Sequence, residues 1–223
     1  MQKLKFIAAF AAASALSGPA LAGSPDGKVQ IKVLATGVLV DGKITQVKRD
    51  VLALTPGAQA DVNDNVVPTV AVEYFASPNV SVETICCLTQ HHATGKGTLA
   101  GARLVDHIMI LPATVTLKYH LDAGPIKPYV GVGPSLFLFI DEKPGATARS
   151  LGVSRLKLSN EVGFALQAGV DIPVNDKGMG ISLDAKKYFM DTTAHFYAGG
   201  AQVLTTKHKL DPWVVSGGVS YRF

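Results

Sequence analysis

The sequence has little of what marks several common protein classes. Its two cysteines, Cys86 and Cys87, are adjacent, so their side chains point to opposite faces of an extended chain, and a bond between them would need strained geometry. Two cysteines exclude a disulfide framework, and we interpret both as packing residues. Beyond residue 22 there is no run of eighteen apolar residues, which argues against a membrane-spanning helix in that part of the chain.

Motifs of catalysis and metal binding are also missing. There is no Gly-x-Ser-x-Gly, no helical His-x-x-x-His and no Gly-rich loop that leads into a helix. We therefore expect neither an enzyme nor a cofactor. Metal binding by histidines is a weaker alternative to their being plain polar residues of connecting segments. These histidines are His91, His92, His107, His195 and His208.

An excess of charge of one sign is lacking as well. The formal charge is +4, and two of the lysines, Lys3 and Lys5, lie in the N-terminal segment, so the rest of the chain carries +2. This value is too near zero to indicate a nucleic-acid partner.

The N-terminal segment predicts export. Lys3 and Lys5 precede an apolar run over residues 6–16, and Ala20-Leu21-Ala22 fits a small-x-small cleavage site. The run is too short to span a membrane and lacks the amphipathic pattern of a buried first helix. We expect a signal peptide over 1–22, cleaved after Ala22, and one β-barrel domain over 23–223.

What the sequence does contain is alternation. Residues 213–223 place Trp213, Tyr221 and Phe223 with valines on one face, and small residues, polar residues and Arg222 on the other. Side chains of a strand point alternately to its two faces, so one face is apolar with aromatic residues near both ends. That pattern is typical of a strand that crosses a bacterial outer membrane. The terminal Phe223 also predicts recognition by the barrel assembly machinery.

Seven further segments share this period of two, and their connections alternate in length. The eight predicted strands are 28–41, 65–76, 79–90, 108–121, 127–140, 158–172, 178–190 and 210–223. Residues 77–78, 122–126 and 173–177 are tight turns rich in Pro, Gly, Asp and Asn. Residues 42–64, 91–107, 141–157 and 191–209 are long and polar. The sequence therefore predicts an all-β, eight-stranded antiparallel transmembrane β-barrel with short periplasmic turns and long extracellular loops.

The two faces agree from strand to strand. Outward we place apolar residues such as Val132 and Leu166, in contact with outer-membrane lipid, and inward we place the mid-strand charges, with Lys187 near the outer rim as the exception. A charge on the lipid face at the bilayer midplane costs about 2–4 kcal/mol, so this segregation is informative. A soluble eight-stranded barrel with the apolar face inside is the alternative.

Four segments of the C-terminal half resemble the outer membrane protein W (OmpW) family. They are residues 111–120, Lys127-Pro128-Tyr129-Val130-Gly131-Val132-Gly133, Gln167-Ala168-Gly169-Val170-Asp171, and Leu210-Asp211-Pro212-Trp213 running to Tyr221-Arg222-Phe223. The chain departs from the family at Met179-Gly180, where a Trp often opens the strand. The resemblance implies an eight-stranded barrel of the bacterial outer membrane that passes or binds small hydrophobic compounds and has no assigned catalytic chemistry.

Strand direction sets the height of each inward residue. A charged network is expected in the lower, periplasmic half of the lumen, from Lys32, Glu73, Glu83, Lys118, Asp171 and Arg222. An apolar gate or binding region is expected above it, from Val38, Val67, Ile85, Ile110, Phe137, Phe139, Tyr188 and Val214.

We interpret this lumen as an apolar cup, open to the outside, above an ion-paired floor. A small hydrophobic molecule would leave it sideways, into the bilayer, because the charged floor opposes straight passage. Two alternatives remain open. The upper residues pack against one another and the network is purely structural, or the protein is a structural or receptor-type barrel whose external loops bind partners without transport.

Overall fold

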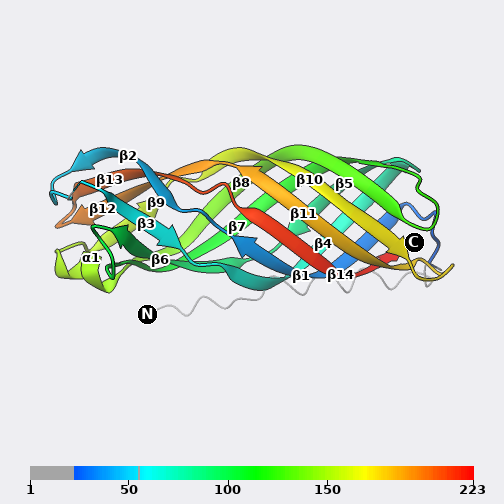
Figure 1. Cartoon of the computed structure of the whole chain (residues 1–223), viewed down its shortest axis with the longest axis horizontal. Coiled ribbons are helices and arrows are strands. Elements are labelled where there is room, and N and C mark those ends of the chain that lie inside the picture. The colour runs from blue at the N-terminus through cyan, green and yellow to red at the C-terminus, as the bar shows by residue number, and fades with distance from the viewer. Residues whose placement is uncertain (1–22, 55) are drawn as a thin grey trace.

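The computed structural model describes residues 23–54 and 56–223, and nearly all of them lie in β-strands (Figure 1). The predicted signal peptide, residues 1–22, lies outside the described residues. Among the described residues, no helix is long and apolar enough to cross a membrane.

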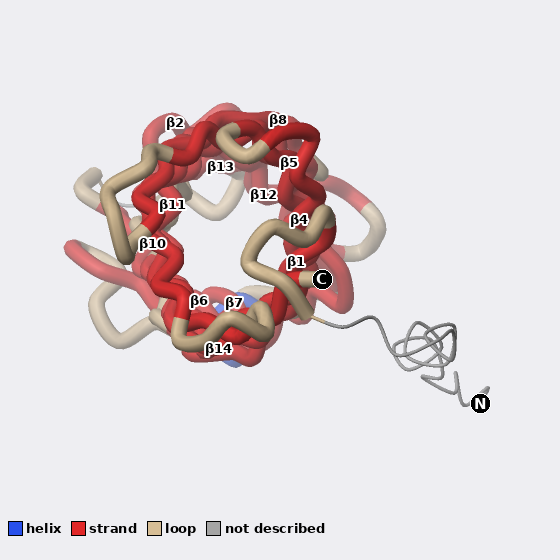
Figure 2. Tube along the Cα trace, turned by 90° about the vertical axis from the view of Figure 1, so that its right-hand side faces the viewer, coloured by secondary structure: helices blue, strands red, loops and turns tan. Residues whose placement is uncertain are grey.

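Eight strands form a closed antiparallel barrel, which confirms the predicted fold. Each pairs with the next, and the last, β14, pairs with the first, β1, from Gln30–Arg222 to Leu39–Trp213. Viewed along the barrel, the strands make a ring (Figure 2). Because every strand of the ring has a neighbouring strand on each side, the ring is closed. The strands are β1 (Val29–Leu39), β4 (Asn65–Ser77), β5 (Val80–Cys86), β7 (Arg103–His120), β8 (Lys127–Pro144), β10 (Glu161–Pro173), β11 (Met179–Phe189) and β14 (Trp213–Arg222).

The two faces of the wall are as the alternation predicts. Val132 and Leu166 are 50% and 47% exposed, whereas Lys118 on the neighbouring strand β7 is 1% exposed. The side chains of Phe164 and Phe189 stack on the outer face, with ring centroids 4.7 Å apart. The outer face of the wall is therefore apolar and buried charges lie on its inner face. A soluble barrel has the opposite arrangement.

The four long connections lie at one end of the barrel, but they are not irregular loops. They continue the wall as strands and one short helix, and part of this outer extension is a separate four-stranded sheet in the order β2-β13-β12-β9. The segments are β2 (Lys43–Asp50), β3 (Ala58–Val62), β6 (Thr89–Gly97), α1 (Ala146–Ser150), β9 (Arg155–Leu158), β12 (Asp191–Ala198) and β13 (Ala201–Lys209).

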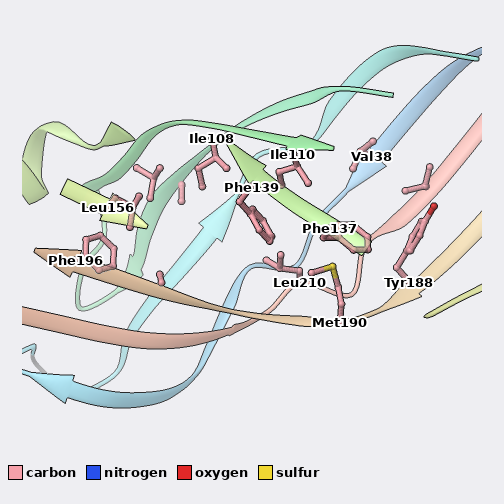
Figure 3. Packing of buried hydrophobic residues seen from close by; sticks show 14 of the residues in the cluster. Val38, Ile108, Ile110, Phe137, Phe139, Leu156, Tyr188, Met190, Phe196 and Leu210 are labelled. Atoms are coloured by element: carbon pink, nitrogen blue, oxygen red, sulfur yellow. The ribbon is translucent and has the colours of Figure 1, made fainter. Parts of the chain in front are cut away.

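The lumen is divided by height. Charged and hydroxyl side chains fill the part near the short turns, and an apolar cluster begins above them and runs into the outer extension. In Figure 3, Phe137 and Phe139 project from β8 into this cluster, toward Met190 and Leu210. The boundary between the two zones positions the candidate site.

Candidate functional site in the barrel lumen

The lower lumen holds an ion cluster built from facing strands. Lys32 lies 2.8 Å from Glu73, 3.1 Å from Glu83 and 3.3 Å from Asp171. Lys118 lies 2.8 Å from Glu73 and 3.0 Å from Glu83, so two lysines bridge the same two glutamates. The structure thus brings together five of the six residues expected in the network.

Four further residues extend the cluster upward. Lys186 lies 2.7 Å from Asp184 and 3.1 Å from Glu83, and the Gln167 amide donates to both Glu83 and Asp184. Tyr129 donates to Asp184 at 2.9 Å, and its ring lies 3.6 Å from the Lys118 ammonium. Period-two alternation places all four side chains inward, but nothing in the sequence shows that uncharged Gln167 and Tyr129 join the ions.

Arg222 lies apart from these ion pairs. Within the described residues its guanidinium has no carboxylate within ion-pair distance; Nε donates to the Gly27 carbonyl at 2.6 Å, and the group lies 3.5 Å from the Phe75 ring centroid. The expectation that Arg222 belongs to the network therefore differs from the observed geometry. Its strand position is one step from the short-turn rim, where the chain entering β1 crosses and offers a carbonyl.

The cluster fills the lower lumen with buried, paired charges. Lys32, Glu73, Glu83 and Lys118 are each at most 2% exposed, so their charges are satisfied by one another rather than by bulk water. To pass through, an apolar molecule must separate these pairs, and a buried charge that loses its partner costs several kcal/mol. We call the cluster of Lys32, Glu73, Glu83, Lys118, Asp171, Asp184 and Lys186 the ionic floor.

An apolar cavity lies directly above the floor. Its volume is about 30 Å³. That is space for about two water molecules. Six of the eight residues expected in the apolar region line it. They are Val38, Ile85, Ile110, Phe137, Tyr188 and Val214.

A second apolar cavity of about 50 Å³ lies in the outer extension and has Phe139 in its lining. The remaining predicted residue, Val67, belongs to the same buried cluster. Farther out, Val105, Leu156 and Phe196 pack over the lumen. The structure therefore differs from an open cup: the upper lumen is a packed apolar interior that contains these two small cavities, and the outer strands that the sequence did not predict cover it.

The wall beside the first cavity is interrupted. The β4–β5 ladder ends at Val70–Cys86, the β5–β7 ladder ends at Ile85–Thr114, and the β6–β7 ladder begins at Thr89–Ile110. Continuing these registers would place Leu88 opposite Pro68 and Cys87 opposite Pro112. Proline has no N–H to donate, which accounts for a break at this place.

Comparison with known proteins identifies the family of this chain. The model of the OmpW family matches residues 25–223. The chain belongs to the OmpW family. An outer-membrane protein of Sinorhizobium fredii, y4mB, is 34% identical over 98% of this chain and 92% of its own length. The protein is accordingly an outer-membrane barrel, with its short turns on the periplasmic side and its extension outside.

Solved structures agree with the family assignment. The crystal structure of OprG from Pseudomonas aeruginosa has a TM-score of 0.75 and 26% identity, covering 90% of this chain and 98% of OprG. The solid-state NMR structure of AlkL in lipid bilayers has a TM-score of 0.72 over 92% of this chain, and at 24% identity it shows the shared fold alone.

In this OmpW-family barrel the C-terminal residues close the ring. Phe223 exchanges backbone hydrogen bonds with Val29, at 2.8 and 2.9 Å. Tyr221 lies on the lipid face near the periplasmic end, and Trp213 lies on the same face near the outer end, with the Lys187 ammonium 5.2 Å from its ring. These residues therefore mark both edges of the apolar belt.

The histidines of the extension are dispersed. His91 lies 2.7 Å from the Asn63 carbonyl, and His208 lies 3.0 Å from the Gly42 carbonyl. In the described part of the chain, no group of three or more His, Cys, Asp or Glu side chains could hold a metal ion. Buried His91 and half-buried His208 instead fasten turns of the extension.

Proposed function

We propose that this barrel takes up small, uncharged apolar molecules from outside and releases them sideways into the outer membrane. The observation that carries the proposal is the order of three features along the lumen: an apolar interior above, an ionic floor below, and an interrupted wall between Pro68 and Leu88 at the boundary. Neither a closed structural barrel nor a water-filled pore requires these three features together.

Energetics favour the apolar interior as the place of binding. Each Å² of apolar surface removed from water contributes about 25 cal/mol, so a small hydrocarbon gains several kcal/mol there. The cavities are small, and Phe137, Phe139, Met190 and Leu210 must rearrange to admit it. Methionine and leucine side chains at this boundary have the rotamer freedom that such repacking needs.

Release at the side follows from the floor and the break. Ion pairs oppose movement downward, whereas the two ladders beside Leu88 end at Val70–Cys86 and Ile85–Thr114, and Pro68 and Pro112 have no N–H to extend them. Opening the wall there therefore breaks fewer ladder hydrogen bonds than opening it between two complete ladders. A molecule in the cavity would then pass beside Leu88, whose side chain is on the lipid face.

A reversible disulfide across the break, which we call a staple, tests the side exit. Cysteines at positions 68 and 88, in a Cys86→Ser, Cys87→Ser background, place two thiols across the break. Uptake of the apolar dye 1-N-phenylnaphthylamine by cells should fall at least fivefold when the staple is oxidised and return on reduction. Equal uptake in both states contradicts the side exit.

A charge in the cavity tests binding itself. Phe137→Asp should abolish saturable dye binding by the purified barrel in nanodiscs, because it places a carboxylate in the apolar site. An aspartate at exposed Ser150 on α1 is the matched control. Unchanged binding by a folded Phe137→Asp barrel would overturn the proposal.

A further inference from the structure

The outer extension has an edge strand on each side of a seam. β2 ends the four-stranded sheet, and β3 ends the ten-stranded sheet, so no backbone ladder joins these two strands in the described residues. Both lie at the end of the molecule opposite the chain's C-terminus (Figure 1). The barrel is a closed cylinder, whereas the extension above it is not.

Between the described residues of β2 and β3, one side chain takes the place of the missing ladder. The Ile44 N–H donates to Gln59 Oε1 at 3.0 Å, and Gln59 Nε2 donates to the Ile44 carbonyl at 3.3 Å. The primary amide of Gln59 thus engages both backbone groups of one β2 residue, as a neighbouring strand would. Deleting this one amide removes both bonds.

The opposite seam of the extension, between β8 and β9, is held differently. Glu142 accepts a hydrogen bond from the Leu158 N–H at 3.3 Å and pairs with Lys157, also at 3.3 Å. Nearby, Asn160 accepts from the Phe139 N–H at 2.9 Å. An ion pair and two separate side chains hold that seam, whereas one neutral amide holds the seam between β2 and β3.

The β2–β3 seam borders the outer apolar cavity. Ala60, which follows Gln59, lines this cavity, and so does His208, which lies opposite Ile44 in the β2–β13 ladder. Val40 and Val62 complete the lining on this side. Separation of β2 from β3 at Gln59 therefore exposes the cavity to the outside.

We propose that the β2–β3 seam is the entrance for apolar molecules and that Gln59 is the residue that holds it closed. The inference rests on the proposed function, to which it adds a point of entry. The chemical class it admits is uncharged and apolar, because the cavity offers valine, leucine, isoleucine and phenylalanine side chains. Its two histidines, His91 and His208, already contact turn carbonyls.

Thiol labelling tests opening independently of transport. Ala194 lines the cavity and is 5% exposed, so a cysteine there, in a Cys86→Ser, Cys87→Ser background, reports access. Labelling by uncharged N-phenylmaleimide should be about tenfold faster with Gln59→Leu. It should be unchanged with Gln46→Leu, a control on β2, and intermediate with Gln59→Glu, which keeps the acceptor. Equal rates in the folded Gln59→Leu and parent proteins overturn the inference.

Dye uptake separates this inference from the proposed function. The pair Ile44→Cys and Gln59→Cys can form a disulfide across the seam, and oxidation should slow uptake severalfold. If this staple has no effect while the staple at 68 and 88 blocks uptake, the entrance lies elsewhere and the side exit stands. If neither staple has an effect, the proposed function fails, whatever the labelling shows.

Discussion

At the scale of single residues, the ionic floor is the least ordinary part of the protein. Seven charged side chains meet inside a barrel whose outer surface is apolar, and each carboxylate is matched by lysines or hydroxyl groups. Ser81 donates to Glu73 and Ser182 donates to Asp171, both at 2.5 Å, so the lone pairs left by the lysines are also used. Such a cluster is stable only while it is complete.

Removing one lysine should therefore be costly. Lys118→Met keeps the volume of the side chain but leaves Glu73 and Glu83 each with one lysine fewer. We expect the free energy of unfolding in lipid vesicles, measured by urea titration, to fall by about 3–5 kcal/mol. Lys127→Met, at the half-buried start of β8, is the control and should change it by less than about 1 kcal/mol. A Lys118→Met barrel as stable as the parent would show that the floor does not hold the barrel together.

How far the floor was predictable depends on the residue. Alternation fixes which side chains point inward, and counting along each strand fixes their height, so Lys32, Glu73, Glu83, Lys118 and Asp171 could be grouped from sequence. Arg222 was grouped with them by height alone. Its actual partners, the Gly27 carbonyl and the Phe75 ring, depend on how the chain crosses the periplasmic mouth, and no periodicity records that path.

At the scale of elements, the outer strands are where the sequence was least informative. β12 buries Thr192, Thr193, Ala194 and Phe196, but small and polar residues dominate, and its pattern predicts no membrane strand. β2 has only Ile44 and Val47 as apolar residues and is exposed along almost its whole length. β12 packs over the lumen and β2 pairs with β13, and neither strand needs contact with lipid, so an apolar outer face is absent.

Acid should loosen this extension. Burial lowers the pKa of His208 below its ordinary value, and the hydrogen bond to the Gly42 carbonyl only partly opposes this. A histidine of this kind binds protons more readily in the unfolded state than in the folded state. The free energy of unfolding is therefore unaffected by this residue above about pH 6.5 and decreases as the pH falls below that value.

Hydrogen exchange checks this expectation. Between pH 7.5 and 5, protection of the β2 and β13 amides, corrected for intrinsic rates, should decrease more than that of the barrel strands. His208→Gln should abolish part of the difference, whereas His195→Gln, on β12 of the same sheet, should not. An unchanged pH dependence in His208→Gln would exclude His208 as the cause.

In the molecule as a whole, the apolar and charged faces are inverted relative to a soluble barrel. A soluble barrel buries its apolar residues and exposes its charges, whereas here the lipid-facing wall is apolar and the seven charged residues of the ionic floor lie within. The floor, the apolar cavities and the interrupted wall have their proposed roles only if the outer wall contacts acyl chains. Family membership and fold place the barrel in the outer membrane, and the orientation of single side chains can be measured directly.

The most direct test is NMR of the unmodified barrel in lipid nanodiscs with methyl-labelled Val, Leu and Ile. Methyl groups of Val132 and Leu166 should show NOEs to lipid acyl-chain protons, and those of Val38 and Ile85 should show none. Acyl-chain NOEs to Val38 and Ile85, with Val132 and Leu166 shielded from lipid, would contradict the account.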